Sequence, residues 1–489
     1  MTTEYPILMR KEAHKLFVGL ALLAPLPAFA GDGATAANNL QIDLTHHWVG
    51  YFSLAVIIIA YVAAMFEEST ELRKSKPMLL ASSLIWFAIV YVYRGQGATE
   101  VAVNAFTSNL LAYIQLFLFI MVSMTYLNAM EDMKVFDALR IWLVGKHFSY
   151  RRMFWITGVL VFFLSSALNG LTMGLLMGAV VMAVGRKSPK FVSLACINIV
   201  IATNAGGSFS PLGGISTLFV WQRGMLGFGD FFNLFIPCVV NFLIPACIMH
   251  FAVPKDKPDF ESLHVNMQRG AKRVIFLFAT TVGLAVVSDT YFHMPAAAGM
   301  MAGLSLLQFF TFFLQKTSER DQVVLLNCDS VPDVAEEIIG SSNRYNIFEK
   351  VGRLEWDTLL FFYGAMVGIG GLGFIGYLDT VSHLLYGQHS PTTANILIGL
   401  SSAFVDNGTL MFAVLSMHPN LPQGQWLLIT LTLGVGGSLL AIGSAPGIGL
   451  LGQSKGFYTF SGHMKWFPAI LLGYFASIGV HFLINARFF

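Results

Sequence analysis

Two stretches of this 489-residue sequence are near copies of each other: SSALNGLT at residues 165–172 and SSAFVDNGT at residues 401–409. Each interrupts an apolar segment, 153–185 or 391–418, with small and polar residues. A glycine-rich segment follows each copy, at 203–214 and 434–447. Non-helical backbone at membrane depth is tolerated only where protein or a cavity covers it. The sequence therefore predicts two repeats, each with a re-entrant hairpin followed by a broken helix.

The remaining sequence is typical of membrane-spanning helices. The chain is 55% apolar and only 11% charged, with a mean hydropathy of +0.67, which excludes an ordinary soluble protein. We expect an all-α integral membrane protein with about ten crossings besides the two hairpins. The stretches of spanning length are 48–66, 77–93, 108–130, 191–223, 228–253, 271–288, 295–315, 356–376, 425–452 and 463–486.

The distribution of lysine and arginine supports this layout, because short cytoplasmic loops are enriched in both. If the mature chain begins outside and each hairpin returns to the side that it entered, only Arg94, Arg223 and Arg487 fall outside. A full crossing in place of either hairpin would invert every later loop and remove the asymmetry. The hairpins then enter from opposite sides, so the halves are inverted copies. Secondary transporters use such inverted repeats to build a site near the bilayer midplane.

The N-terminus resembles a targeting signal. Three basic residues precede the apolar run 16–26 and the small-residue site 28–30, which predicts a signal peptide over 1–30; an uncleaved first helix is the alternative. Either reading implies a bacterial inner membrane. We expect scaffold helices over 48–145, a first repeat over 153–253, further scaffold helices over 271–315, a cytoplasmic linker over 316–355 and a second repeat over 356–489.

Several functional classes are excluded. A formal net charge of +2 leaves no excess basic surface for nucleic acid. The four cysteines lack metal-type spacing, so neither a zinc site nor a disulfide framework follows. The sequence carries no His-Glu-x-x-His zinc helix and no phosphate-binding loop, which argues against a membrane enzyme or an ATP-driven pump. We expect no cofactor.

The side chains at the interruptions favour a cation. Asp406 is the only carboxylate in the middle of a hairpin, and an ionisable group at membrane depth is a candidate for function. Neither break contains Lys or Arg. Asp406 could also cap a helix, a role that is compatible with ion binding. The predicted ligands of a Na⁺ ion at Asp406 are the side chains of Asn407, Thr409, Asn169, Thr172, Thr203, Asn204, Ser208 and Ser444, with the backbone at Ala205, Gly206, Gly207, Gly443, Ala445 and Gly447.

Two more acids lie where the span 108–130 meets the cytoplasm. Glu131 is either a proton relay or gate, or a solvated carboxylate at the end of a helix. For Asp132 we expect the solvated role.

Ordered motifs from about residue 43 to the C-terminus resemble the NhaD family of Na⁺/H⁺ antiporters. The resemblance implies the ion transporter superfamily fold, with a scaffold domain that usually dimerises and a transport domain that moves like an elevator. It also implies exchange of Na⁺ or Li⁺ for H⁺. The motifs are DLT at 43–45, WVG at 48–50, EE at 67–68, LRKSKP at 72–77, MTYLNAME at 124–131, VFDALR at 135–140, NAGG at 204–207 and GSAPG at 443–447.

The chain departs from the family pattern at two acids. NhaD-like proteins usually carry Asp-Asn-Leu-Thr-Thr in the first hairpin and end the first broken-helix motif in Gly-Asp, whereas this chain has NGLTM at 169–173 and SPLGG at 210–214. Clustered carboxylates repel one another, which raises a pKa and helps protons compete with Na⁺. With Asp406 alone, we expect weaker, electroneutral 1:1 exchange by competition at one site.

Two other functions remain open at this point. The protein could be a Na⁺-coupled carrier of a small anion or carboxylate, bound near Asn169 and Thr203. It could also be a non-transporting membrane subunit or sensor that has kept the fold of an antiporter.

Overall fold

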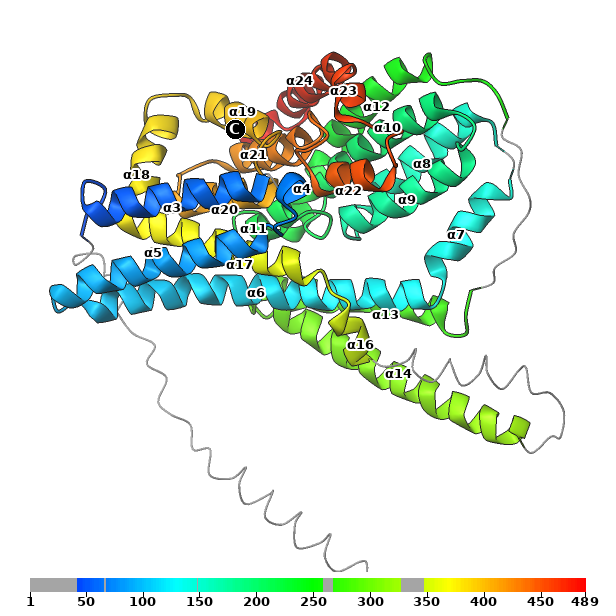
Figure 1. The fold of residues 1–489 in the computed structure, drawn as a ribbon, viewed down its shortest axis with the longest axis horizontal. Coiled ribbons are helices and arrows are strands. Elements are labelled where there is room, and N and C mark those ends of the chain that lie inside the picture. The colour runs from blue at the N-terminus through cyan, green and yellow to red at the C-terminus, as the bar shows by residue number, and fades with distance from the viewer. Residues whose placement is uncertain (1–41, 66, 147, 258–266, 327–346) are drawn as a thin grey trace, which may run out of the picture. The chain divides into compact units, whose positions relative to one another are not determined.

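The computed structural model describes residues 42–65, 67–146, 148–257, 267–326 and 347–489 (Figure 1). The regular structure in these ranges is helical. Nine of the described helices are long and apolar enough to cross a membrane. The expected signal peptide, 1–30, and the middle of the expected linker lie outside the described residues.

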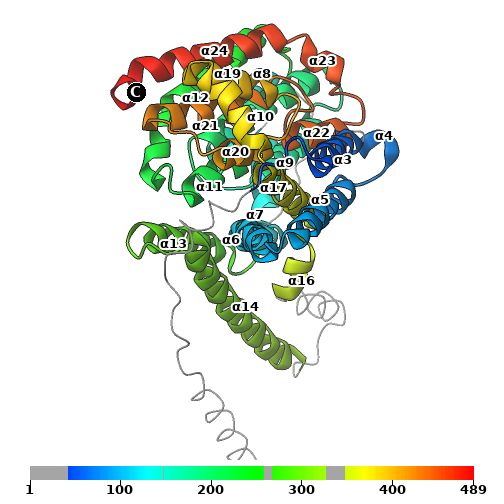
Figure 2. The same ribbon diagram turned by 90° about the vertical axis from the view of Figure 1, so that its left-hand side faces the viewer.

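One group of long helices lies outside the hairpins and broken helices. In this group α5 contacts both α3 and α17, α6 contacts α5, α17 and α14, and α13 pairs with α14 (Figures 1 and 2). Its members are α3 (Trp48–Met65), α5 (Ser75–Gly95), α6 (Thr99–Asp132), α13 (Ala271–Thr290), α14 (Ala296–Leu326) and α17 (Trp356–Ile375). The sequence order placed 356–376 with the second repeat, but α17 packs mainly against α5.

Small residues permit that packing. A methyl group added at Gly364 of α17 would lie 2.5 Å from the backbone carbonyl carbon of Met78 in α5, and one at Gly371 would lie 2.7 Å from the Ile85 side chain. In a membrane, where lipid is as apolar as leucine, close backbone approach is a main source of helix association.

The two repeats have the same order of elements. The first contains α8 (Tyr150–Leu164), α9 (Gly170–Val184), α10 (Pro189–Ser208), α11 (Ile215–Gln222), η2 (Phe228–Leu234) and α12 (Phe235–His250). The second contains α19 (Pro391–Ser401), α20 (Asn407–Ser416), α21 (Gln423–Gly436), α22 (Ala445–Gln453), α23 (Phe460–Met464) and α24 (Phe467–Ile484). In each repeat a helix pair precedes a helix that breaks after a small residue.

Contacts between the repeats follow the same symmetry. The second hairpin arm of each repeat packs against the short helix that follows the break of the other repeat, α9 against α22 and α20 against α11 (Figure 1). The longer parts of the two broken helices, α10 and α21, pack against each other, and α12 packs along α24. A site built at the hairpin turns and breaks therefore has contributions from both halves.

The lengths of the hairpin arms explain the topology. The arms contain 15, 15, 11 and 10 residues, which at about 1.5 Å per residue gives helices of roughly 15–22 Å. A hydrocarbon core of about 30 Å is too thick for any of them. The expected span 425–452 is divided into α21 and α22 of 14 and 9 residues, because the backbone leaves the helix at residues 437–444.

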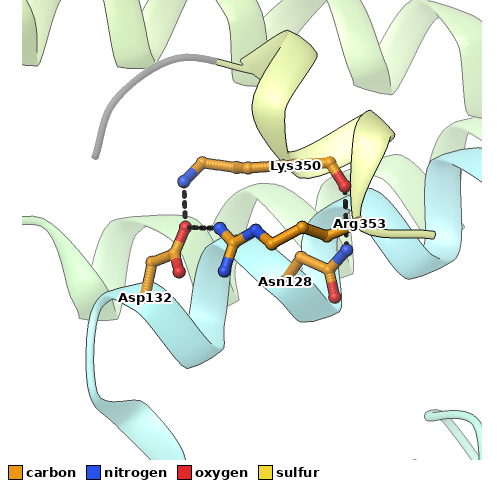
Figure 3. Close-up of polar contacts among 4 residues, drawn as sticks. All are labelled: Asn128, Asp132, Lys350 and Arg353. Carbon is orange, nitrogen blue, oxygen red and sulfur yellow. Dashed lines mark hydrogen bonds and ion pairs between the residues drawn. The ribbon is translucent and has the colours of Figure 1, made fainter. Parts of the chain in front are cut away.

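The expected linker over 316–355 is partly helical. Helix α14 continues to Leu326, and α16 (Ile347–Gly352) precedes α17. Figure 3 shows how α16 is attached to α6: Asp132 pairs with both Lys350 and Arg353, and Asn128 Nδ2 donates to the Lys350 carbonyl at 2.9 Å. Lys350 is 1% exposed. The expectation that Asp132 is solvated is therefore wrong, because two cations from α16 and its C-terminal end cover it.

The remaining described elements are short connectors. The segment before α3 binds α17 and α18, since Leu44 N–H donates to the Ile375 carbonyl and Tyr377 donates to that of Thr45. The Asp43 side chain accepts bonds from both the backbone and the hydroxyl of Thr45, which lower its pKa. These connectors are α4 (Glu67–Thr70), α7 (Val135–Val144), α18 (Tyr377–Ser382), η4 (His383–Gly387) and η5 (Ala486–Phe488).

Candidate ion-binding site

The turn of the first hairpin is stabilised by a side-chain cap. Helix α9 begins directly after Asn169, whose Oδ1 accepts a hydrogen bond of 3.0 Å from Leu171 N–H. Such a cap satisfies one of the amides that a helix N-terminus leaves free. The hydroxyl of the buried Ser165 donates to the Val161 carbonyl.

The first broken helix lies against this turn. Helix α10 ends at Ser208 and α11 begins at Ile215. A methyl group at Gly213 would lie 2.5 Å from the Ser165 carbonyl oxygen and 2.8 Å from that of Gly207. Only glycine permits such an approach, and it brings two backbone carbonyl oxygens to one point.

The second repeat reproduces this arrangement. A methyl group at Gly443 would lie 2.7 Å from the Gly437 carbonyl oxygen and 2.8 Å from that of Ala403 in the hairpin turn. Each repeat thus places the carbonyl of a hairpin turn beside a carbonyl from the end of the helix that precedes its own break. Oxygen atoms gathered in this way can replace part of the hydration shell of a cation.

Asp406 occupies the position in the second turn that Asn169 occupies in the first. Its Oδ2 accepts bonds from the backbone N–H and the hydroxyl of Thr409, at 3.1 and 3.3 Å, and it caps α20. Its side chain is half-buried. The next turn of α20 packs on the first repeat, since a methyl at Gly408 would lie 2.9 Å from Ile215 at the start of α11. Asp406 therefore caps its helix, as the alternative interpretation proposed, and still lies beside the first break.

A second polar group lies where the two broken helices cross. Asn204 Nδ2 donates to Ser444 Oγ at 3.0 Å, which joins the repeats directly. Thr203 contacts the start of α9, because a methyl at Gly170 would lie 2.7 Å from its Cγ2. Ser208 approaches α21 so closely that a methyl at Gly434 would lie 2.0 Å from its hydroxyl. All four polar side chains are buried.

The predicted side chains therefore form two groups. Asp406, Thr409 and Asn407 lie at the second hairpin turn, while Thr203, Asn204, Ser208 and Ser444 lie at the crossing, beside Asn169. Within the described ranges no hydrogen bond joins the two groups. Thr172 and Asn407 are half-buried.

Some backbone positions differ from the prediction. Ala205, Gly206 and Gly207 remain helical in the last turn of α10, and Ala445 and Gly447 belong to the first turn of α22; of the named positions, Gly443 alone lies in a break. The reason is packing: a methyl at Gly206 would lie 2.1 Å from the Phe162 carbonyl oxygen, so this glycine serves close contact rather than chain reversal. The carbonyls of the last helical turn still lack partners within α10.

Sequence reasoning missed two residues around the site. Tyr61 of α3 faces Asp406 and Thr409. His463 of α23 binds the carbonyl of Ser438 in the second break. Glu131, by contrast, is exposed at the end of α6, beside the Asp132 ion pairs. A tyrosine in an apolar helix and a single histidine at the start of an apolar stretch carry no distinguishing sequence pattern.

Inverted repeats, short hairpins and crossing broken helices define a secondary transporter of the inner membrane. The comparisons with known proteins narrow this class. Residues 61–434 match a family described as citrate transporters. The chain is 49% identical to "Na(+)/H(+) antiporter NhaD" of Vibrio cholerae serotype O1, over 96% of this chain and 98% of that protein. Antiporters of the same name from Alkalimonas amylolytica and Vibrio parahaemolyticus are 48% and 50% identical, over 96% and 82% of this chain and 96% and 98% of their own lengths. The chain belongs to the NhaD family of Na⁺/H⁺ antiporters, and it is a multi-pass membrane protein.

Proposed function

We propose that this protein exchanges Na⁺ or Li⁺ for H⁺ across the bacterial inner membrane, with Asp406 as the single carboxylate at which the two ions compete. The relatives that match nearly the whole chain are named as Na⁺/H⁺ antiporters. The observation that carries the site assignment is the position of Asp406, a half-buried acid at the turn of a hairpin and beside the break of the other repeat.

The chemistry of the surrounding atoms suits Na⁺. Thr409 binds Oδ2 of Asp406, which orients the carboxylate. The carbonyls of Ala403 and Gly437 converge near Gly443 in the same repeat. Carboxylate, hydroxyl and carbonyl oxygens are hard ligands of the kind that alkali cations prefer. Asn407 lies in the same turn and adds a further oxygen.

Competition explains how one acid can couple two ions. Na⁺ binds the ionised Asp406 and a proton displaces it. The site therefore has the same net charge whether it holds Na⁺ or H⁺. The repeats carry this site between the two sides as a transport domain, while α3, α5, α6, α13, α14 and α17 stay fixed as a scaffold that forms a homodimer in the lipid bilayer. One carboxylate per site gives electroneutral 1:1 exchange. Glu131 is exposed near the cytoplasmic end of α6, where a proton relay or gate would act.

The two positions that depart from the family pattern fit this mechanism. Asn169 keeps the cap that an aspartate would provide, because both side chains are equivalent caps. At Gly214 a methyl group would lie 3.5 Å from its nearest neighbours, so a side chain fits there without displacing backbone. Both positions can therefore differ between relatives without changing the frame of the site.

The test is exchange by everted vesicles from antiporter-deficient cells. Addition of Na⁺ or Li⁺ should dissipate a preformed pH gradient with the unaltered protein, and Asp406→Asn should abolish the response. Asparagine preserves the helix cap, so the variant loses only the charge. Asp379→Asn, in α18, is the matched control and should exchange normally. Normal exchange by Asp406→Asn would refute the assignment, and no exchange by the unaltered protein present in the membrane would refute the function.

A second candidate is Na⁺-coupled uptake of a small carboxylate. The family description and the four helix N-termini at the turns and breaks favour it, because helix N-termini attract anions. Accumulation of labelled citrate or succinate by proteoliposomes under a Na⁺ gradient would support this candidate. If no labelled carboxylate accumulates while Na⁺/H⁺ exchange is observed, the second candidate is refuted and antiport is the function that remains.

A further inference from the structure

A tyrosine from outside the repeats faces the proposed exchange site. Tyr61 lies one turn before the end of α3, the helix that packs against α5. Its ring is half-buried, but its hydroxyl oxygen is fully buried and forms no hydrogen bond with any described residue. A buried hydroxyl without a partner is costly, and in native proteins it commonly marks a place where water or an ion completes the contact.

The surroundings of this hydroxyl are the functional residues themselves. The Tyr61 hydroxyl lies near the Thr409 hydroxyl and within range of the charge of Asp406, but without the geometry of a hydrogen bond to either. Thr409 donates to Oδ2 of Asp406, so both of its bonds are directed to a single carboxylate oxygen. The phenol oxygen, the threonine hydroxyl and the carboxylate thus face one another from two helices that are far apart in sequence.

We propose that the Tyr61 hydroxyl contacts the hydrated alkali cation held at Asp406, as an oxygen ligand supplied by α3 rather than by the repeats. This inference rests on the proposed function. A phenol oxygen can offer a lone pair to a cation or its water while its O–H donates to a carboxylate. The buried hydroxyl then has its partner when the ion is bound.

The geometry determines what removal of the hydroxyl does. Tyr61→Phe keeps the ring and its packing but deletes the one atom that faces the site. The apparent affinity for Na⁺ should fall about tenfold, the effect expected from one hydrogen bond or ligand contact at a charged group. The maximal exchange rate at saturating Na⁺ should remain, because Asp406 still carries the competition between the two ions.

The experiment is a Na⁺ titration of exchange in everted vesicles, paired with a Na⁺ titration of the thermal unfolding midpoint of the purified full-length protein. Tyr51→Phe is the matched control, since Tyr51 lies on the same helix and is 58% exposed. We expect both titrations of Tyr61→Phe to shift to about tenfold higher Na⁺, with Tyr51→Phe unchanged and with equal unfolding midpoints in the absence of Na⁺. Tyr61→Met, a second residue without a hydroxyl, should shift in the same way.

The outcomes separate the two proposals. If Asp406→Asn abolishes exchange while Tyr61→Phe and Tyr61→Met titrate like the unaltered protein, the Tyr61 contact is overturned and the exchange site stands. A loss of stability without Na⁺, with no change in the Na⁺ midpoints, would make Tyr61 a purely structural residue and also overturn the contact. If the unaltered protein does not respond to Na⁺ in either assay, both proposals fail.

Discussion

His463 should make the stability of the fold depend on pH in a narrow window. Its imidazole is fully buried in α23, outside the candidate spans. Nε2 lies 2.9 Å from the Ser438 carbonyl oxygen, and Nδ1 lies 2.8 Å from the Tyr458 hydroxyl. A carbonyl only accepts, so Nε2 carries the proton and donates to Ser438, while Nδ1 accepts from Tyr458. Burial lowers the pKa of His463 to about 4, from 6.5.

The direction of the effect follows from this shift. The folded protein holds His463 neutral, whereas the unfolded chain takes up a proton below pH 6.5, so acid favours unfolding. The stabilisation is complete above pH 6.5 and declines until the pH reaches about 4. A shift of about 2.5 units is worth about 3 kcal/mol, of which about 2 kcal/mol is lost between pH 7.5 and pH 5.

The assay is denaturant unfolding of the purified protein in detergent at pH 7.5 and pH 5. His463→Gln keeps an N–H that can donate to Ser438 but does not titrate. The unaltered protein should lose about 2 kcal/mol more than this variant between the two pH values. His293→Gln, at an exposed histidine, should behave like the unaltered protein. An equal loss in the unaltered protein and His463→Gln would refute the assignment of a buried neutral histidine.

Three further substitutions, the first with its own control, test the packing at the first break, the effect of a second acid and the attachment of α16. Gly213→Ala should cost about 1–3 kcal/mol and lose Na⁺ exchange, because its methyl would lie 2.5 Å from the Ser165 carbonyl oxygen. Gly479→Ala, which meets nothing within 4 Å, should be neutral in the same denaturation and exchange assays. Gly214→Asp should fold normally and move the pH profile of exchange towards alkaline pH, because a second acid near Asp406 makes it harder to ionise both carboxylates. An unchanged pH profile would mean that the two carboxylates do not influence each other, and would contradict this prediction. Lys350→Met should destabilise the protein by about 1–3 kcal/mol, because it removes one of the two ion pairs of Asp132 and leaves the pair with Arg353. A denaturation midpoint equal to that of the unaltered protein would contradict this prediction.

The helices were predictable because apolar length is a direct signal in a membrane protein. The expected spans 77–93 and 271–288 correspond to α5 and α13 within a few residues. The positions of the breaks were harder to predict, because the sequence alone does not distinguish a glycine that ends a helix from a glycine that permits close packing. Gly206 remains helical against the Phe162 carbonyl, while Gly213 lies in the break. Only the neighbouring backbone distinguishes these two uses.

The candidate site was predictable to the extent that its residues are unusual for their surroundings. Asp406 was found because a carboxylate is rare in an apolar hairpin. The sequence does not single out Tyr61 and His463, because a tyrosine in a membrane helix and an isolated histidine are both common. Tyr61 matters because it lies near Asp406, and His463 matters because it binds the Ser438 carbonyl. In both cases the partner lies in a different part of the sequence. Such contacts exist only once the helices have packed.

The two halves of this fold share a backbone frame but differ in charge. Both hairpin turns cap their second arm with a side-chain oxygen, and both direct a carbonyl towards a glycine of the break. The first turn carries the neutral Asn169 and the second carries Asp406. Under the proposed mechanism, coupling needs only one group that binds either a cation or a proton, so the two turns can differ in charge while they share a frame. In the exchange proposed above, the acid of the second turn is therefore sufficient for coupling, while Asn169 in the first turn keeps only the structural role of a helix cap.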